Sequence, residues 1–244
     1  MSVRQIHNLL DLLERYAEAA SPRSLAEIQT DHGWPRSSAH NILKTLATRG
    51  YLYEPGRRGA HYPTPLLLRL AERIAAGDPA VGALGERLQA LAAETGETAI
   101  LAGPGGGYAV YLDVAESEAP VRYAARVGTR LPLTDSASGR ALLSLLPDRE
   151  RERWLRLARF DGAGPNALPS ADAVRVSLGE AEKRGWFESC NEHAEELAAV
   201  AVPFRRGGQP LALALGGPSG RIAPRMAALA ARLRTEVEQL NDTA

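Results

Sequence analysis

The sequence predicts an α+β fold built in two parts. Helical spacing of apolar residues recurs within the first 50 residues, and a candidate β-hairpin follows directly. From residue 97 onward, short apolar runs bounded by glycine and proline alternate with helical patterns, as in a sheet covered by helices. These observations predict a small N-terminal domain over residues 1–65, a linker helix over 66–78 and a larger domain over 79–244.

The composition is that of an ordinary globular protein. Of the 244 residues 45% are hydrophobic, and 29 Lys and Arg balance 29 Asp and Glu. No apolar run approaches the roughly 20 residues that cross a bilayer, and the acid-containing N-terminus is unlike a signal peptide. Cys190 is the only cysteine, so we expect a cytoplasmic protein without disulfides or membrane contact. The histidines lack metal-ligand spacing, and we expect neither metal nor cofactor.

Three helices are expected before residue 50. The first carries apolar residues on one face, at Ile6, Leu9, Leu10, Leu13 and Tyr16. Ser24 and Glu27 have the spacing of a capping box, which predicts the start of the second helix. Pro35 suits the first turn of a third helix that runs to Arg49, and Gly50 supplies its left-handed end.

The third helix divides into two faces. Its apolar stripe comprises Ala39, Ile42, Leu43 and Leu46, and its opposite side carries Ser37, His40, Asn41, Lys44 and Thr48. Residues 32–53 contain no acid that would repel phosphate. Such a face can enter a DNA major groove, although for the helix considered alone a solvated face is the favoured interpretation.

The segment after the third helix favours DNA binding. Residues 51–53 and 60–62 are candidate strands around Pro55 and Gly56, and the tip carries Arg57 and Arg58. Three helices followed by a basic hairpin make a winged helix-turn-helix, whose wing arginines meet the DNA backbone or minor groove. Double-stranded operator DNA is the expected partner, and the candidate contacts are Ser24, Arg36, Ser37, Ser38, His40, Asn41, Lys44, Arg57 and Arg58.

Residues 33–52, GWPRSSAHNILKTLATRGYL, resemble the recognition-helix signature of the isocitrate lyase regulator (IclR) family. That signature reads Gly-Leu-Pro-Lys-Ser-Thr-Val-His-Arg-Leu-Leu and continues to a Gly-Tyr pair. Trp34 replaces the leucine and preserves packing, whereas Asn41 replaces a groove-facing arginine, so the operator sequence does not carry over. The resemblance implies a bacterial transcription regulator that controls a catabolic operon in response to a small-molecule effector.

Two apolar helices are expected after the wing. Leu66, Leu67, Leu70, Ala71 and Ile74 form the first stripe, ended by residues 77–79, and Val81, Leu84, Leu88 and Leu91 form the second. From sequence alone these leucines are core residues or a dimer contact. The resemblance favours the dimer contact and implies a homodimer or homotetramer.

The larger domain is expected to contain strands and helices in alternation. Gly103–Gly107 separates two strands as a hairpin turn, because no Lys-Ser/Thr pair follows as in a phosphate loop. A third strand is expected at 121–127 and a helix within 133–147. Further strands are expected at 197–204 and 210–217, with helices over 170–184 and from Met226 to Leu240.

The resemblance extends over this domain, through residues 128–142, 185–203 and 213–218. It implies a GAF-like fold with an effector pocket on one sheet face. The residues implied to bind the effector are Leu131, Thr134, Asp135, Ser136, Ala137, Gly139, Ser189, Cys190, Ala199, Ala201, Ala214 and Gly216. Backbone N–H groups at the helix start would hold an anion, for which Asp135 is an awkward neighbour.

The pocket strands depart from the family pattern. Where members that bind small oxo-acids carry an Asp, a Cys and two Ser, this chain has Ser189, Ala199, Ala214 and Gly216. We therefore expect a larger or more hydrophobic effector, such as an aromatic acid or a lactone. The alternative is that these small residues serve packing alone.

Two other functions fit the sequence less well. A cysteine hydrolase built on Cys190 and His193 is disfavoured, because Glu188, Glu192, Glu195 and Glu196 would raise the pKa of the thiol. A protein-interaction module without DNA binding does not account for the basic winged segment. We expect a regulator and no enzyme.

Overall fold

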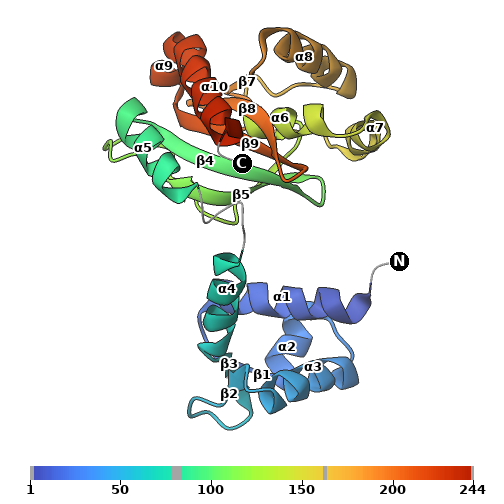
Figure 1. Cartoon of the computed structure of the whole chain (residues 1–244). Helices are drawn as coiled ribbons and strands as arrows, with labels where there is room; N and C mark the ends of the chain where they lie inside the picture. The colour runs from blue at the N-terminus through green and yellow to red at the C-terminus, as the bar shows by residue number, and fades with distance from the viewer. Residues whose placement is uncertain (1–2, 78–83, 162–163, 243–244) are drawn as a thin grey trace. The chain divides into compact units, whose positions relative to one another are not determined.

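The computed structural model describes residues 3–77, 84–161 and 164–242. Its contacts divide the chain into two compact units, residues 1–78 and 79–244 (Figure 1). No helix within the described ranges is long and apolar enough to cross a membrane.

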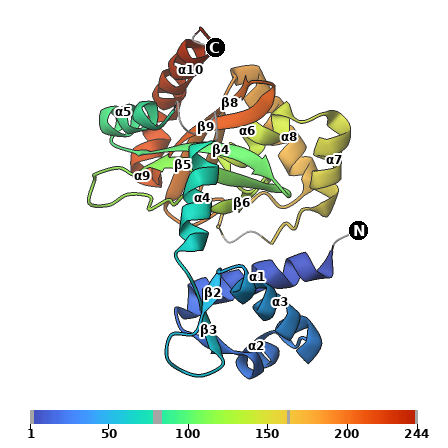
Figure 2. The ribbon, with the colours of Figure 1, turned by 60° about the horizontal axis from the view of Figure 1, so that its bottom comes forward.

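The first unit is a winged helix-turn-helix, as predicted. Three helices pack with a three-stranded antiparallel sheet in the order β1-β3-β2, whose first strand lies between α1 and α2, and a fourth helix follows the sheet. The loop between β2 and β3 projects from this unit as the wing (Figure 2). The elements are α1 (Arg4–Ala19), β1 (Arg23–Ser24), α2 (Leu25–His32), α3 (Arg36–Thr48), β2 (Leu52–Tyr53), β3 (Ala60–Pro63) and α4 (Leu66–Ala76).

Local signals fix the helix ends of this unit. The Ser24 and Glu27 capping box is present at the start of α2, and Gly33 ends that helix in the left-handed conformation. Gly50 has φ +78°, which confirms the predicted stop beyond α3. Ala39, Leu43 and Leu46 of α3 are buried against a core shared with Leu12, Tyr16, Ile28, Trp34 and Leu52.

The second unit is a six-stranded antiparallel sheet with helices on both faces, which confirms the α+β prediction. The strand order is β6-β5-β4-β9-β8-β7. Its elements are α5 (Gly85–Thr95), β4 (Thr98–Gly105), β5 (Tyr108–Ala115), β6 (Arg130–Pro132), α6 (Ala137–Leu145), α7 (Asp148–Leu157), α8 (Ala171–Arg184), β7 (Phe187–Cys190), β8 (Leu197–Arg206), β9 (Gln209–Pro218), α9 (Ser219–Ile222), a short 3-10 turn (Ala223–Arg225) and α10 (Met226–Asp242).

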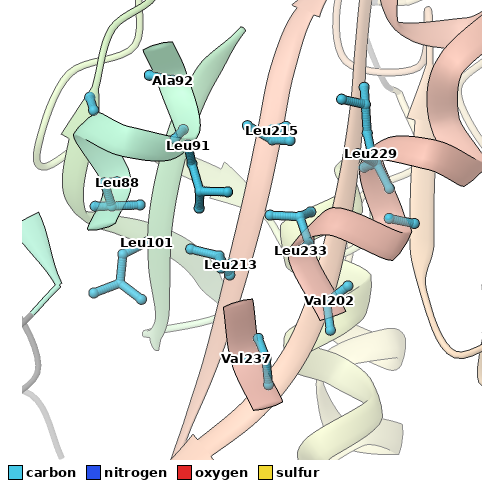
Figure 3. Packing of buried hydrophobic residues seen from close by; sticks show 14 of the residues in the cluster. Leu88, Leu91, Ala92, Leu101, Val202, Leu213, Leu215, Leu229, Leu233 and Val237 are labelled. Carbon is cyan, nitrogen blue, oxygen red and sulfur yellow. The ribbon is translucent and has the colours of Figure 1, made fainter. Parts of the chain in front are cut away.

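Two apolar layers enclose the sheet. Helices α5 and α10 cover one face, where the leucines of both helices meet β4, β8 and β9 (Figure 3). Helices α6 and α8 cover the other face, with Leu155 of α7 at its margin (Figure 2). Leu84, Leu88 and Leu91 are at most 1% exposed, so the dimer contact that the resemblance favoured is wrong for these residues: they belong to the core. Val81 lies outside the described residues.

The strand predicted at 121–127 is wrong. The segment alternates in side-chain character, but it forms no ladder, and Val121 and Val127 are 68% and 63% exposed. The position beside β5 is taken by β6 instead, which pairs residues 130–132 with 108–110. The irregular segment is held by isolated hydrogen bonds, such as the one from Thr98 Oγ1 to the carbonyl of Tyr123 at 2.7 Å.

Candidate nucleic-acid interface and ligand site

Helix α3 presents most of the predicted DNA-contacting side chains together. Arg36, Ser37, His40, Asn41 and Lys44 are exposed on the side opposite the buried stripe. Neither Arg36 nor Lys44 has an acidic partner within the described ranges, so their positive charges are available to phosphate.

Ser38 lies differently from its neighbours. It is half-buried and lines a groove of about 240 Å³ between α1 and α3, together with Gln5, Leu9, Ser37, Asn41, Ile42, Thr45 and Leu46. Thr45 is exposed beside Asn41, but its hydroxyl donates to the Asn41 carbonyl at 2.7 Å. Sequence reasoning left Thr45 out, and this backbone hydrogen bond leaves it little freedom to contact a base.

The wing tip is joined to the start of α2. Arg57 donates to one carboxylate oxygen of Glu27 at 3.0 Å. The other oxygen accepts from the Ser24 backbone N–H at 2.7 Å and from the Ser24 hydroxyl at 2.6 Å. These hydrogen bonds, those from Ser24 foremost, lower the pKa of Glu27 to about 2. Two predicted DNA contacts, Ser24 and Arg57, therefore meet at one carboxylate.

Arg58 is exposed and has no ion-pair partner among the residues the structure describes. The acid of the wing itself, Glu54, accepts the Gly59 N–H at 2.9 Å and lies 3.8 Å from His61 Nε2. The wing thus offers one free guanidinium and one that is already held.

Five of the implied effector residues share one face of the large sheet. Ser189, Ala199 and Gly216 lie side by side in the register of β7, β8 and β9, and Ala201 and Ala214 pair in the next row on that face. Ala201 and Ala214 are buried in the layer beneath α6, as is Leu131.

The start of α6 lies over the same layer. Ser136 caps the helix by accepting the Gly139 N–H at 3.0 Å, and Ala137 and Ser138 are buried in its first turn. A Cβ on Gly139 would lie 2.6 Å from the Leu133 carbonyl oxygen, so only glycine allows this approach. The helix N-terminus provides N–H donors and a partial positive charge for an anion.

Arg140 ties this helix to the sheet edge, and sequence reasoning missed it. The side chain is 1% exposed and donates to both oxygens of Glu192, at 2.5 and 3.0 Å. It also donates to the carbonyls of Thr134, at 2.9 Å, and Glu188. The only available signal was a lone arginine within an apolar helical run.

Tyr111 and Tyr123 add two aromatic rings to the site. Their rings meet edge to face, with hydroxyl oxygens 3.4 Å apart. Burial raises the pKa of Tyr111, which keeps its hydroxyl protonated. A Cβ on Gly216 would lie 3.1 Å from the Tyr123 ring, so this ring fills the space that Gly216 leaves.

Three implied effector residues lie elsewhere. Thr134 and Asp135 line a separate cleft of about 280 Å³ between the β4–β5 turn and α7, whose wall includes Trp154. Thr134 donates its hydroxyl to Asp135 at 2.6 Å. Cys190 packs against the α5 and α10 layer, because neighbours on a strand point to opposite faces and Ser189 faces α6. Cys190 therefore does not share a face with Ser189.

Two family models match the chain in succession. Residues 5–56 match the IclR helix-turn-helix domain, and residues 81–242 match the bacterial transcriptional regulator IclR C-terminal domain. The chain belongs to the IclR family.

Curated IclR relatives span most of the chain. The "Probable transcriptional regulator SauR" of Cupriavidus necator is 32% identical over 196 residues, covering 80% of this chain and 77% of that protein. The regulator XynR of Escherichia coli is 27% identical over 207 residues, covering 82% and 80%. Both relatives are named as transcriptional regulators, and this chain, with its IclR helix-turn-helix domain, is a transcriptional regulator of the same family.

Solved IclR structures share the fold. A regulator from Brucella abortus has a TM-score of 0.75 at 24% identity, covering 100% of this chain and 93% of that one. An IclR homolog from Microbacterium hydrocarbonoxydans, solved with 4-hydroxybenzoate, has a TM-score of 0.71 at 22% identity, covering 95% and 99%.

The cysteine-hydrolase alternative has no support in the site either. Burial, Glu192 and Glu188 raise the pKa of Cys190, in that order of effect, so the thiolate that a nucleophile needs is disfavoured.

Proposed function

We propose that this IclR-family regulator controls a catabolic operon in the bacterial cytoplasm and that a small organic acid changes its affinity for operator DNA. The exposed side of α3 would enter the major groove, and the wing would meet the backbone through Arg57 and Arg58. Residues 1–65 would bind DNA, α4 within 66–78 would link the units, and residues 79–244 would bind the effector. The division of the chain into two compact units after residue 78 supports this assignment.

The operator would be bound by a homodimer or a pair of dimers. Two helices of the first unit carry apolar side chains that are exposed by 40% or more: Val3, beside α1, with Ile6 and Leu10 on it, and Leu66, Leu68, Leu70 and Ile74 on α4. Exposed apolar side chains in such number favour a partner surface, and a second copy would match an operator with inverted half-sites.

The effector would bind between the α6 N-terminus and the face that carries Ser189, Ala199 and Gly216. An acid group would accept hydrogen bonds from the first turn of α6, and the ring of Tyr123 would form the wall above Gly216. Asp135, which is unsuited to an anion, lines the separate cleft instead.

The observation that carries the effector class is the contact of Tyr123 with Gly216 beside the buried Tyr111 hydroxyl. Two aromatic rings and a row of alanines favour an aromatic or apolar acid over a small oxo-acid. The bound 4-hydroxybenzoate of the Microbacterium protein is an aromatic acid of this kind.

A thermal-shift screen tests this proposal. Aromatic acids, aliphatic acids, lactones and small oxo-acids would each be added at matched concentration and pH. We expect at least one aromatic or apolar acid to raise the melting temperature, because a ligand of the folded state stabilises it. Stabilisation by glyoxylate or pyruvate alone would reject the proposed effector class.

A further inference from the structure

The carboxylate of Glu27 connects two elements of the DNA-binding unit. One oxygen accepts from the backbone N–H and hydroxyl of Ser24, at 2.7 and 2.6 Å, and closes the capping box of α2. The other accepts from Arg57 Nη1 at 3.0 Å, across 30 residues of chain. The cap and the wing tip therefore depend on different oxygens of one side chain.

This contact leaves most of the guanidinium free. Arginine has five N–H donors, and the Glu27 contact uses one of them. The Arg57 side chain is 66% exposed, so its remaining donors can reach a phosphate oxygen. An arginine held in one orientation loses less rotamer entropy when it meets DNA than a freely rotating one does.

We propose that Glu27 is a positioning residue for DNA binding, which orients Arg57 toward the same phosphate that the start of α2 approaches. This inference rests on the proposed wing contact with DNA. Glu27, a side chain of the helix-turn-helix, would then hold the wing tip in place before DNA binds. Ser24 and Arg57 would contact the operator together. Arg58, without such a partner, would act as a loosely placed charge.

Simple electrostatics predicts the opposite effect of losing this carboxylate. Removing a negative charge near the phosphate backbone should strengthen DNA binding, because repulsion falls. A positioning role predicts weaker binding despite the added net positive charge. The direction in which operator affinity changes when Glu27 loses its charge therefore distinguishes the electrostatic explanation from the positioning role.

The test uses the full chain and the duplex that the wild-type protein selects from a randomised DNA library. Glu27→Gln keeps an acceptor for the capping box, in which glutamine is an accepted residue, but it cannot hold the guanidinium by charge. Arg57→Ala and the double variant complete a double-mutant cycle. Glu18→Gln is the matched control, since Glu18 is 71% exposed on the same unit and pairs with Arg15.

We expect Glu27→Gln to weaken operator binding by about 2- to 10-fold, the cost of ordering one long side chain. In the Arg57→Ala background, Glu27→Gln should not weaken operator binding further. The control Glu18→Gln should not weaken operator binding either. Equal or tighter binding by folded Glu27→Gln would overturn the positioning role, as would an equal loss with and without Arg57.

A second comparison does not need Glu27→Gln to fold. Arg57→Ala should cost more operator affinity than Arg58→Ala, although the two remove the same charge from the same loop. Equal losses would also overturn the inference. A wild-type protein that selects no DNA sequence would instead reject the proposed function, and this inference with it.

Discussion

Arg140 and Glu192 form an ion pair in which the guanidinium is almost entirely buried, with N–O distances of 2.5 and 3.0 Å. The carboxylate is 12% exposed and lies in the loop between β7 and β8. The pair therefore fixes the start of α6 against the sheet edge, beside the place where we propose that the effector binds.

Replacing Arg140 with alanine should strongly destabilise the second unit. Glu192 would keep a poorly hydrated charge without its partner, and the free energy of unfolding should fall by about 3 kcal/mol. Urea denaturation measures the change. Arg175→Ala is the matched control, because Arg175 pairs with Glu152 at the surface, where both side chains are about 40% exposed. Equal effects of the two variants would refute the structural role of Arg140.

Gly139 and Gly179 provide a second matched pair. A Cβ on Gly139 would meet backbone atoms of Leu133 at 2.6 to 2.8 Å. A Cβ on Gly179, within α8, would meet no atom within 4 Å beyond the neighbouring backbone of its own helix. Gly139→Ala should cost about 1 to 3 kcal/mol through overpacking. Gly179→Ala should add about 0.5 to 1 kcal/mol, since alanine is the better helix former. Melting temperatures that move in the same direction would contradict these assignments.

Tyr123 should control the response to effector. Tyr123→Ala removes the ring that packs on Gly216, and the affinity for an aromatic acid should fall about tenfold for loss of an aromatic contact. Operator affinity without effector should stay the same, because Tyr123 lies outside the DNA-binding unit. Tyr108→Ala is the control, since Tyr108 lines the separate cleft. Calorimetric titration gives both affinities, and an unaltered response in Tyr123→Ala would exclude this site.

The salt dependence of operator binding reports the phosphate contacts. Lys44→Ala and Arg58→Ala should each flatten the plot of log affinity against log salt by about 0.9, the value for one phosphate neutralised on B-DNA. Both side chains are exposed and unpaired within the described ranges. Lys183→Ala, an exposed lysine of α8, should leave the slope unchanged. If Lys44→Ala and Arg58→Ala leave this slope unchanged, the two side chains do not contact phosphate in the complex.

Features set by residues near one another in the chain were predictable from sequence. The Ser24 and Glu27 cap, the left-handed Gly50 and the division of α3 into two faces all depend on spacings of four residues or fewer. The hairpin of β4 and β5 was equally local, with its turn at Gly106 and Gly107.

Features that depend on distant partners were not predictable. Arg140 meets Glu192 across 52 residues, and Arg57 meets Glu27 across 30. The alternation of residues 121–127 resembles a strand, but only pairing with another strand makes one, and β6 holds that position. Sequence spacing alone likewise could not decide that Cys190 faces α5 and α10.

The most direct test of the account is a gel shift with DNA upstream of the protein's own gene, at fixed salt, with and without the acid that most raises the melting temperature. The account predicts a specific complex whose affinity that acid changes, because an effector that favours one of two states shifts DNA binding. A specific complex that is indifferent to the stabilising acid would contradict the claim that ligand and operator binding are coupled.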